Sequence, residues 1–242
     1  MQLSREQVES FWQSRVAKLD TVRDPCHYMD YWMDRYTWET RTAALEKIGC
    51  LKNSDYTVDI GCGLGKYTEF LWGLMESDGV CRGFDRKEFT DLATIDYAVY
   101  NQLTFHEGLV PSYDIQLAVQ EADVVTLLTV WDFMSIEDRG YLSTWFRSMK
   151  KGSNVVMIDI MTNDVPWHQQ DLSYKHVDEW AVKNVMMKIA GFEVQQQVPV
   201  SCANMQIFHK LGKNAPAFYL SKLWDKLPFT KPQVSCVSWL KT

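Results

Sequence analysis

The chain has 242 residues, which suits one domain with a large core, and its 46% hydrophobic and 23% charged residues are ordinary for a soluble globular protein. A formal net charge of −6, with no long run of lysine and arginine, argues against a nucleic-acid-binding surface. No apolar stretch approaches the ~18 residues that a membrane span needs.

The N-terminal segment is expected to be helical and rich in aromatic residues. Ser4 with Gln7 resembles a capping box, and the apolar residues that follow have helical period. Those residues are Val8, Phe11, Trp12, Val16 and Leu19. A second helix is expected over 37–49, ending at Gly49. The aromatic residues around its start are Tyr28, Tyr31, Trp32, Tyr36 and Trp38.

From residue 56 onward, short apolar runs alternate with amphipathic segments, which predicts strands alternating with helices. The expected strands lie at 56–60, 80–84, 103–105, 123–129 and 154–160. The near-continuous apolar character of 123–129 fits a strand that is covered on both faces, as in a parallel sheet. This order predicts an α/β, doubly wound architecture.

The C-terminal part admits two interpretations. Residues 192–200 and 204–210 are typical of two strands joined by a short turn, which predicts an antiparallel hairpin. Alternatively, 233–240 is the true last strand, and 201–232 is an insertion over the site.

A glycine-rich turn follows the first expected strand, in the run Val-Asp-Ile-Gly-Cys-Gly-Leu-Gly that ends at Gly65. Alternate glycines let the backbone turn sharply and leave no Cβ to block a ligand. The dinucleotide fingerprint Gly-x-Gly-x-x-Gly does not match, because Gly65 comes one residue early and Lys66 stands where that pattern has glycine. The P-loop pattern also fails, since its spacing and its hydroxyl residue are missing.

The stretch from Asp59 to Gly65 resembles motif I of the class I S-adenosylmethionine-dependent methyltransferases, Asp/Glu-x-Gly-x-Gly-x-Gly, at every fixed position. The resemblance runs over about 56–210 and includes Lys-Lys-Gly at 150–152 and Ala-Gly-Phe at 190–192. It implies a seven-stranded, mostly parallel sheet with an antiparallel last strand and helices on both faces.

The expected division of the chain has three parts. Residues 1–50 form an N-terminal helical cap or lid, and 51–211 form the S-adenosylmethionine-binding core. Residues 212–242 form a C-terminal extension packed on that core.

The resemblance implies S-adenosyl-L-methionine as the cofactor and S-adenosyl-L-homocysteine as its product. A carboxylate at the end of the second strand binds the ribose hydroxyls, and Asp85, 24 residues past Gly61, stands there. A helix N-cap is the alternative role for Asp85. Glu107 is expected at the adenine, with a plain surface position as its alternative. The expected cofactor-binding residues are Asp59, Gly61, Cys62, Gly63, Gly65, Asp85, Arg86, Glu107, Gly108 and Thr129.

The catalytic candidates follow the fourth and fifth strands. Asp132 is the first candidate to contact the nucleophile, as acceptor or base, with a turn aspartate as the alternative. His168 is the second candidate, although an ordinary surface-loop histidine is the favoured interpretation. Substrate-binding candidates are the aromatic residues Tyr28, Trp32, Trp131 and Trp167. Aromatic faces attract cations and suit an amine acceptor, while core packing is the alternative for most of them.

The resemblance implies methyl transfer by in-line displacement to nitrogen or oxygen of a small molecule. The alternatives are a protein or RNA methyltransferase and a non-catalytic cofactor-binding scaffold. A dehydrogenase fails on glycine spacing. No nucleic-acid or membrane partner is expected. No metal is expected either, because a metal ion would have to be bound by Asp132, Asp159 and Asp164, and Asp159 falls inside a strand. A monomer and a homodimer both remain open.

The cysteine pattern bears on the compartment. The six cysteines show no Cys-x-x-Cys spacing, so a zinc or redox motif is not expected. The N-terminus also lacks the apolar core of a signal peptide. A reducing, cytoplasmic location is therefore expected.

Overall fold

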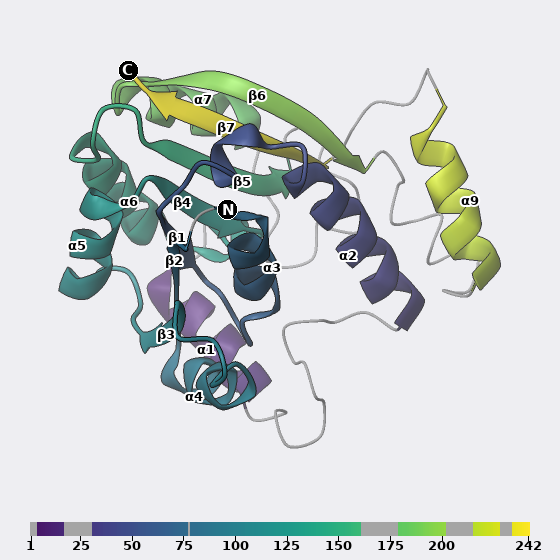
Figure 1. Ribbon diagram of the computed structural model, residues 1–242, viewed down its shortest axis with the longest axis horizontal. Coiled ribbons are helices and arrows are strands. Elements are labelled where there is room, and N and C mark those ends of the chain that lie inside the picture. The colour runs from purple at the N-terminus through teal and green to yellow at the C-terminus, as the bar shows by residue number, and fades with distance from the viewer. Residues whose placement is uncertain (1–3, 17–30, 77, 161–178, 202–214, 228–233) are drawn as a thin grey trace.

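The computed structural model describes residues 4–16, 31–76, 78–160, 179–201, 215–227 and 234–242 (Figure 1). The strands are β1 (Tyr56–Ile60), β2 (Val80–Asp85), β3 (Leu103–Glu107), β4 (Val124–Leu128), β5 (Asn154–Ile160), β6 (Phe192–Ser201) and β7 (Val234–Lys241). The helices are α1 (Arg5–Val16), α2 (Tyr31–Leu45), α3 (Lys66–Leu74), α4 (Lys87–Asp96), α5 (Tyr113–Glu121), α6 (Ile136–Arg147), α7 (Glu179–Ile189) and α9 (Ala215–Asp225), with 3-10 turns η1 (Gly49–Leu51) and η2 (Trp131–Phe133).

The described strands form one seven-stranded sheet in the order β3-β2-β1-β4-β5-β7-β6 (Figure 1). Neighbours from β3 to β5 are parallel, and β7 is antiparallel to both β5 and β6. The doubly wound, mostly parallel sheet with an antiparallel last strand is therefore confirmed. At the carboxyl edge of this sheet, the loops that follow β1, β2 and β4 meet, and such an edge is where open α/β sheets bind ligands.

The strand next to β6 is β7, which agrees with the second interpretation of the C-terminal part, a strand over 233–240. The register runs from Phe192 opposite Lys241 to Ser201 opposite Val234. The segment 204–210, expected as the partner, lies outside the described residues. β7 is flanked by strands on both edges and its residues from Ser235 to Trp239 are buried, so its small and apolar side chains suit an inner position. The boundary expected at residue 211 does not delimit the sheet.

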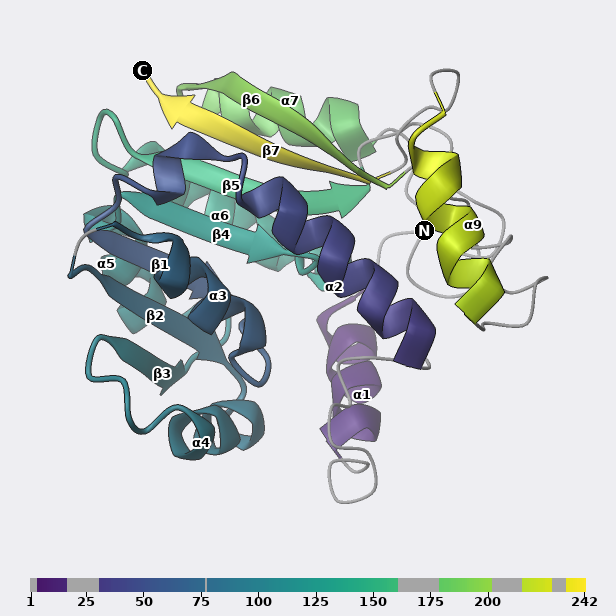
Figure 2. The same ribbon diagram turned by 45° about the vertical axis from the view of Figure 1, so that its right-hand side comes forward.

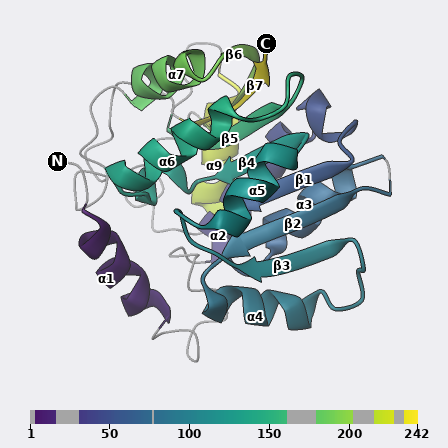
Figure 3. The same ribbon diagram turned by 90° about the vertical axis from the view of Figure 1, so that its left-hand side faces the viewer.

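Helices cover both faces of the sheet (Figures 2 and 3). On one face α5, α6 and α7 pack against alternate strand residues such as Val155 and Met157. On the other face α2 and α3 pack against the intervening residues, such as Val156 and Ile158. Each strand contributes to both core layers because successive side chains point to opposite faces. Within the described ranges, no helix has both the length and the apolar character that crossing a bilayer requires.

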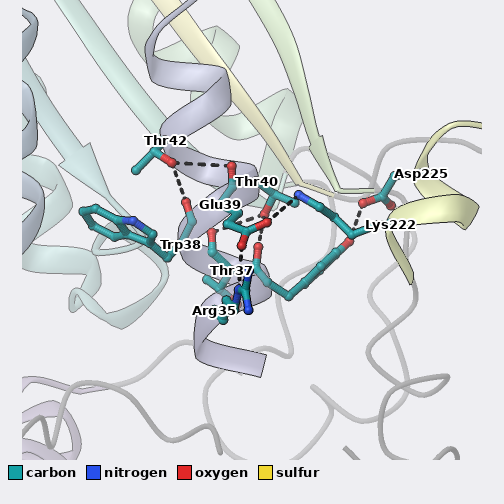
Figure 4. A network of polar contacts seen from close by, with 9 residues as sticks. Arg35, Thr37, Trp38, Glu39, Thr40, Thr42, Lys222 and Asp225 are labelled. Atoms are coloured by element: carbon teal, nitrogen blue, oxygen red, sulfur yellow. Dashed lines mark hydrogen bonds and ion pairs between the residues drawn. The ribbon is translucent and has the colours of Figure 1, made fainter. Parts of the chain in front are cut away.

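α9 is fixed to α2 by a charged network (Figure 4). Glu39 on α2 accepts a hydrogen bond from Nε of Arg35 at 2.7 Å and forms an ion pair with Lys222 of α9 at 3.0 Å. The hydrogen bond from Arg35 is the main cause that lowers the pKa of Glu39. The hydroxyl of Tyr36 donates to Asp225 at 2.5 Å. The connection between β6 and β7 is therefore anchored to the helix that covers the core.

A buried ion pair links α7 to the sheet. Lys183 is fully buried, and its Nζ lies 3.2 Å from Oδ2 of Asp159 on β5. Removing one member of such a pair leaves the other charge in a medium that solvates it poorly. The position of Asp159 inside a strand, expected from the sequence, is confirmed.

Lys183→Met is expected to lower the free energy of unfolding by ~3–5 kcal/mol, because it strands the carboxylate of Asp159 in the core. Urea unfolding followed by circular dichroism measures the change. Lys87→Met is the matched control, since Lys87 is exposed and its pair with Asp91 is solvated. Equal midpoints for the two variants would contradict this account of the pair.

Candidate cofactor site

The turn between β1 and α3 is built from glycines in left-handed backbone conformation. Gly61, Gly63 and Gly65 have φ of 77°, 54° and 83°, values that side chains disfavour. The N–H groups of Gly61 and Cys62 donate to the carbonyl oxygen of Phe84, at 2.8 and 3.2 Å. The turn is thus fastened to the end of β2, and α3 begins directly after it.

Packing also excludes side chains at Gly61 and Gly65. A Cβ on Gly61 would lie 2.4 Å from a methyl carbon of Val130, and one on Gly65 would lie 2.6 Å from the ring of Phe105. Both distances are too short for real contacts. The glycines are therefore required by their neighbours as well as by their φ values.

Asp85 ends β2 beside this turn. One carboxylate oxygen accepts the N–H of Gly63 at 2.7 Å, and the other accepts the N–H of Arg86 at 2.7 Å. A carboxylate has about four acceptor positions, so two are left for donors such as a pair of adjacent hydroxyls. Burial raises the pKa of Asp85, and these two backbone donors oppose that rise.

Asp59 lies below the turn and anchors it. Its side chain is buried, and its two oxygens accept the hydroxyls of Thr126 on β4 and Thr68 on α3, each at 2.7 Å. Burial raises the pKa of Asp59 to about 6, although both hydroxyls favour the charged form. These two hydrogen bonds tie α3 and β4 to the end of β1.

Thr129 is the one non-glycine residue with positive φ in the described part of the chain, at 63°. Its N–H donates to the carbonyl oxygen of Ile158 at 2.8 Å, and its hydroxyl donates to that of Leu128 at 2.6 Å. A β-branched residue in this conformation costs ~1–3 kcal/mol. The turn places Val130 over Gly61, so β4 and the glycine turn form one continuous floor.

Glu107 and Gly108 lie next to Asp85, as expected from the sequence. Glu107 pairs with Asp85 in the register of β2 and β3, and the N–H of Gly108 donates to the carbonyl oxygen of Asp85 at 2.9 Å. Glu107 is exposed. The cofactor-binding residues predicted from the sequence therefore gather at one edge of the sheet, on the ends of β1, β2, β3 and β4.

Arg86 follows β2 directly and pairs with a residue of α1. Its guanidinium donates two hydrogen bonds to Glu9 of α1, at 2.7 and 2.6 Å. Nothing in the local sequence announces this pair, because the two residues are 77 positions apart. The two threonines that hold Asp59 are not among the residues predicted from the sequence; Thr126 is 67 positions from Asp59 and Thr68 is 9.

The predicted catalytic and substrate residues are only partly described. Trp131 is buried in the core on the α5–α7 face, with the guanidinium of Arg139 5.2 Å from its ring centroid, which favours the packing alternative. The backbones of Asp132 and Trp32 lie in η2 and α2, but their side chains are outside the described part. Tyr28, Asp164, Trp167 and His168 lie outside the described residues. In the part of the chain that the structure describes, no group of three or more His, Cys, Asp or Glu residues is placed to hold a metal ion.

Comparisons with known proteins find the likeness at the level of fold. No family model matches the chain, and no curated protein sequence matches it. An O-methyltransferase family protein from Burkholderia thailandensis has a TM-score of 0.58 at 11% identity, over 84% of this chain and 56% of that one. Human N-acetylserotonin methyltransferase, in complex with SAM, has a TM-score of 0.53 at 16% identity, over 84% and 51%.

The chain thus spans about half the length of these two methyltransferases. A third solved structure, of a complex between the Haloferax volcanii Trm112 methyltransferase activator and the putative methyltransferase, matches over 94% of this chain and 97% of that chain. Its TM-score is 0.64 at 17% identity. The chain therefore has the fold of the class I S-adenosylmethionine-dependent methyltransferases.

Gly61→Ala is expected to distort the turn, because the new Cβ meets Val130 and because φ is positive. Urea unfolding should report a loss of more than ~1 kcal/mol. Gly73→Ala is the matched control in α3, where nothing lies within 4 Å of the added carbon, and it should raise stability by up to ~1 kcal/mol. A Gly61→Ala protein as stable as the wild type would contradict the packing argument.

Asp59→Asn is expected to change how stability depends on pH. Because the folded pKa of Asp59 is raised to about 6, its contribution to stability is fully present below pH ~4 and is lost as pH rises through 6. Relative to wild type, the variant should therefore gain about 3 kcal/mol between pH 4 and 7. Urea midpoints measured across this range test it, with Asp91→Asn as the control for removal of a surface carboxylate. A difference that stays constant with pH would exclude the raised pKa.

Proposed function

We propose that the protein is an S-adenosylmethionine-dependent methyltransferase that transfers a methyl group to nitrogen or oxygen of a small molecule. The observation that carries the proposal is the position of Asp85 beside the glycine turn. Its carboxylate accepts hydrogen bonds from the N–H groups of Gly63 and Arg86 and has two acceptor positions left. Solved methyltransferases with the same fold support it.

The residues at this edge fit the cofactor. Asp85 would accept the two ribose hydroxyls, and the absence of a Cβ at Gly61 and Gly63 lets a ligand lie against the backbone. Glu107 and Gly108 stand where the adenine would lie. S-adenosylmethionine, when bound, would supply an electrophilic methyl group carried by a sulfonium.

The chain's own contribution is mainly positioning. An in-line displacement needs the acceptor and the methyl group held in line, and such alignment lowers barriers by ~7–11 kcal/mol in favourable cases. The turn at Thr129 and the contact of Val130 with Gly61 fix the floor against which the ligand would be held. We propose Asp132, and after it His168, as the residues that accept a proton from an acceptor that arrives protonated.

A second candidate is a methyltransferase that acts on a macromolecule together with an activator subunit. The match over nearly the whole of both chains is to a structure from a complex with the Trm112 methyltransferase activator, and this favours the activator subunit. The net charge of −6 speaks against RNA, since phosphate contacts dominate such binding. We therefore place a small acceptor, with an amine as one class that suits an acidic protein, ahead of a nucleic acid.

We further propose a reducing, cytoplasmic location. Support comes from Cys50, Cys62, Cys81 and Cys236, which are free thiols in the described part of the chain. Burial raises the pKa of Cys50 to about 12, so this thiol stays protonated and unreactive.

Calorimetric titration with S-adenosylmethionine, S-adenosylhomocysteine and NAD tests the cofactor. We expect the two adenosyl compounds to bind with micromolar Kd, and Asp85→Ala to weaken both by at least about tenfold, since hydrogen bonds to a charged group contribute ~1.5–3 kcal/mol. Asp91→Ala, on the exposed side of α4, controls for the loss of one carboxylate. Binding of NAD alone, or of none of the three, would contradict the proposal.

A further inference from the structure

α1 is tied to two helices that follow strands at the carboxyl edge of the sheet. Its Arg5 forms an ion pair with Asp138 in the first turn of α6, and its Glu9 pairs with Arg86 at the start of α4. α6 lies beyond the end of β4 and α4 beyond the end of β2, and β1 is the strand between those two. A helix held at both places spans the gap between α6 and α4, and Figure 3 shows α1 beyond the carboxyl edge of the sheet.

The pair between Glu9 and Arg86 has the geometry of a strong ion pair. Both carboxylate oxygens of Glu9 accept from the two terminal nitrogens of Arg86, at 2.7 and 2.6 Å. The Arg86 side chain is 12% exposed and that of Glu9 is 40% exposed, so water screens the pair in part. The hydrogen bond from Arg86 is the main cause that lowers the pKa of Glu9.

Aromatic contacts form a seat for the same helix. Phe11 stacks on Phe133 of η2, with ring centroids 5.7 Å apart. Trp12 meets Phe133 at 5.7 Å and Phe89 of α4 at 6.3 Å, both edge-on. The seat therefore joins the loop that follows β4 to the helix that follows β2, across the site.

α1 is attached to the molecule by these contacts and not by the main core. Among the described residues, none from α1 belongs to either of the two buried core clusters. The helix has 12 residues, a length at which isolated helices are marginal in water. In the described part of the chain, the contacts that hold α1 include two ion pairs and the aromatic seat, and all of these can open without disturbing the sheet.

We propose that α1 is a movable roof over the cofactor site and that the ion pair between Glu9 and Arg86 is its latch. The identity of the enclosed ligand rests on the proposed function, but the latch itself does not. Arg86 acts on the ligand through α1, so it is a positioning residue. With the latch closed, the ligand below is shielded from water and leaves slowly. With the latch open, it exchanges.

Two measurements test the latch on Glu9→Arg, Arg86→Glu and the double variant that restores the pair in reverse. Amide hydrogen exchange of α1, without ligand, should be at least about tenfold faster in each single variant and close to wild type in the double one. Release of bound S-adenosylhomocysteine, followed by stopped-flow displacement, should change in the same pattern. Lys87→Glu is the matched control for Arg86→Glu, because it replaces a positive by a negative charge one residue away, on the exposed side of α4.

The outcomes separate the latch from the proposed function. Unchanged exchange in α1 of the single variants, or no recovery in the double variant, overturns the latch whether or not the ligand binds. Faster exchange with an unchanged release rate overturns the roof. Absence of any binding by wild-type protein counts against the proposed function, and the exchange measurement then decides on the latch alone.

Discussion

The fastening of the glycine turn to the end of β2 is the constraint on which the site depends. Two backbone N–H groups of the turn donate to the carbonyl oxygen of Phe84, and a third, from Gly63, donates to the carboxylate of Asp85. These bonds hold the ends of two parallel strands together where their loops would otherwise diverge. They also orient Asp85 so that its remaining acceptor positions are left beside the turn. The carboxylate of Asp85 is therefore already oriented to accept hydrogen bonds from a pair of ligand hydroxyls, and it need not be ordered when the ligand binds.

The surrounding structure sustains two unfavourable features to keep this arrangement. Asp59 is a buried carboxylate with a raised pKa, and Thr129 is a β-branched residue in left-handed conformation. Both are held by hydrogen bonds to neighbouring elements: Asp59 accepts from hydroxyls of β4 and α3, and the N–H of Thr129 donates to the carbonyl oxygen of Ile158 on β5. Strain and buried charge concentrate where a fold positions ligands, and the order of the strands brings both features to one edge.

The sequence predicts those parts of the site whose signals are local. The spacing of the glycines and the place of Asp85 at the end of the second strand are such signals. In the structure the glycines form the turn after β1, and Asp85 lies beside it. Contacts between distant segments leave no comparable trace. The pair between Glu9 and Arg86 and the bond from Thr126 to Asp59 join residues 77 and 67 positions apart. The last strand was open for a related reason, because both candidate segments have strand-like composition and only the packing between β5 and β6 selects 234–241.

A crystal structure with S-adenosylhomocysteine tests the central claim most directly. The account predicts that both ribose hydroxyls donate to the carboxylate of Asp85, that the adenosyl group lies against the glycine turn, and that α1 closes above it with Glu9 and Arg86 paired. A ligand bound elsewhere, or a ribose that makes no contact with Asp85, would contradict the account.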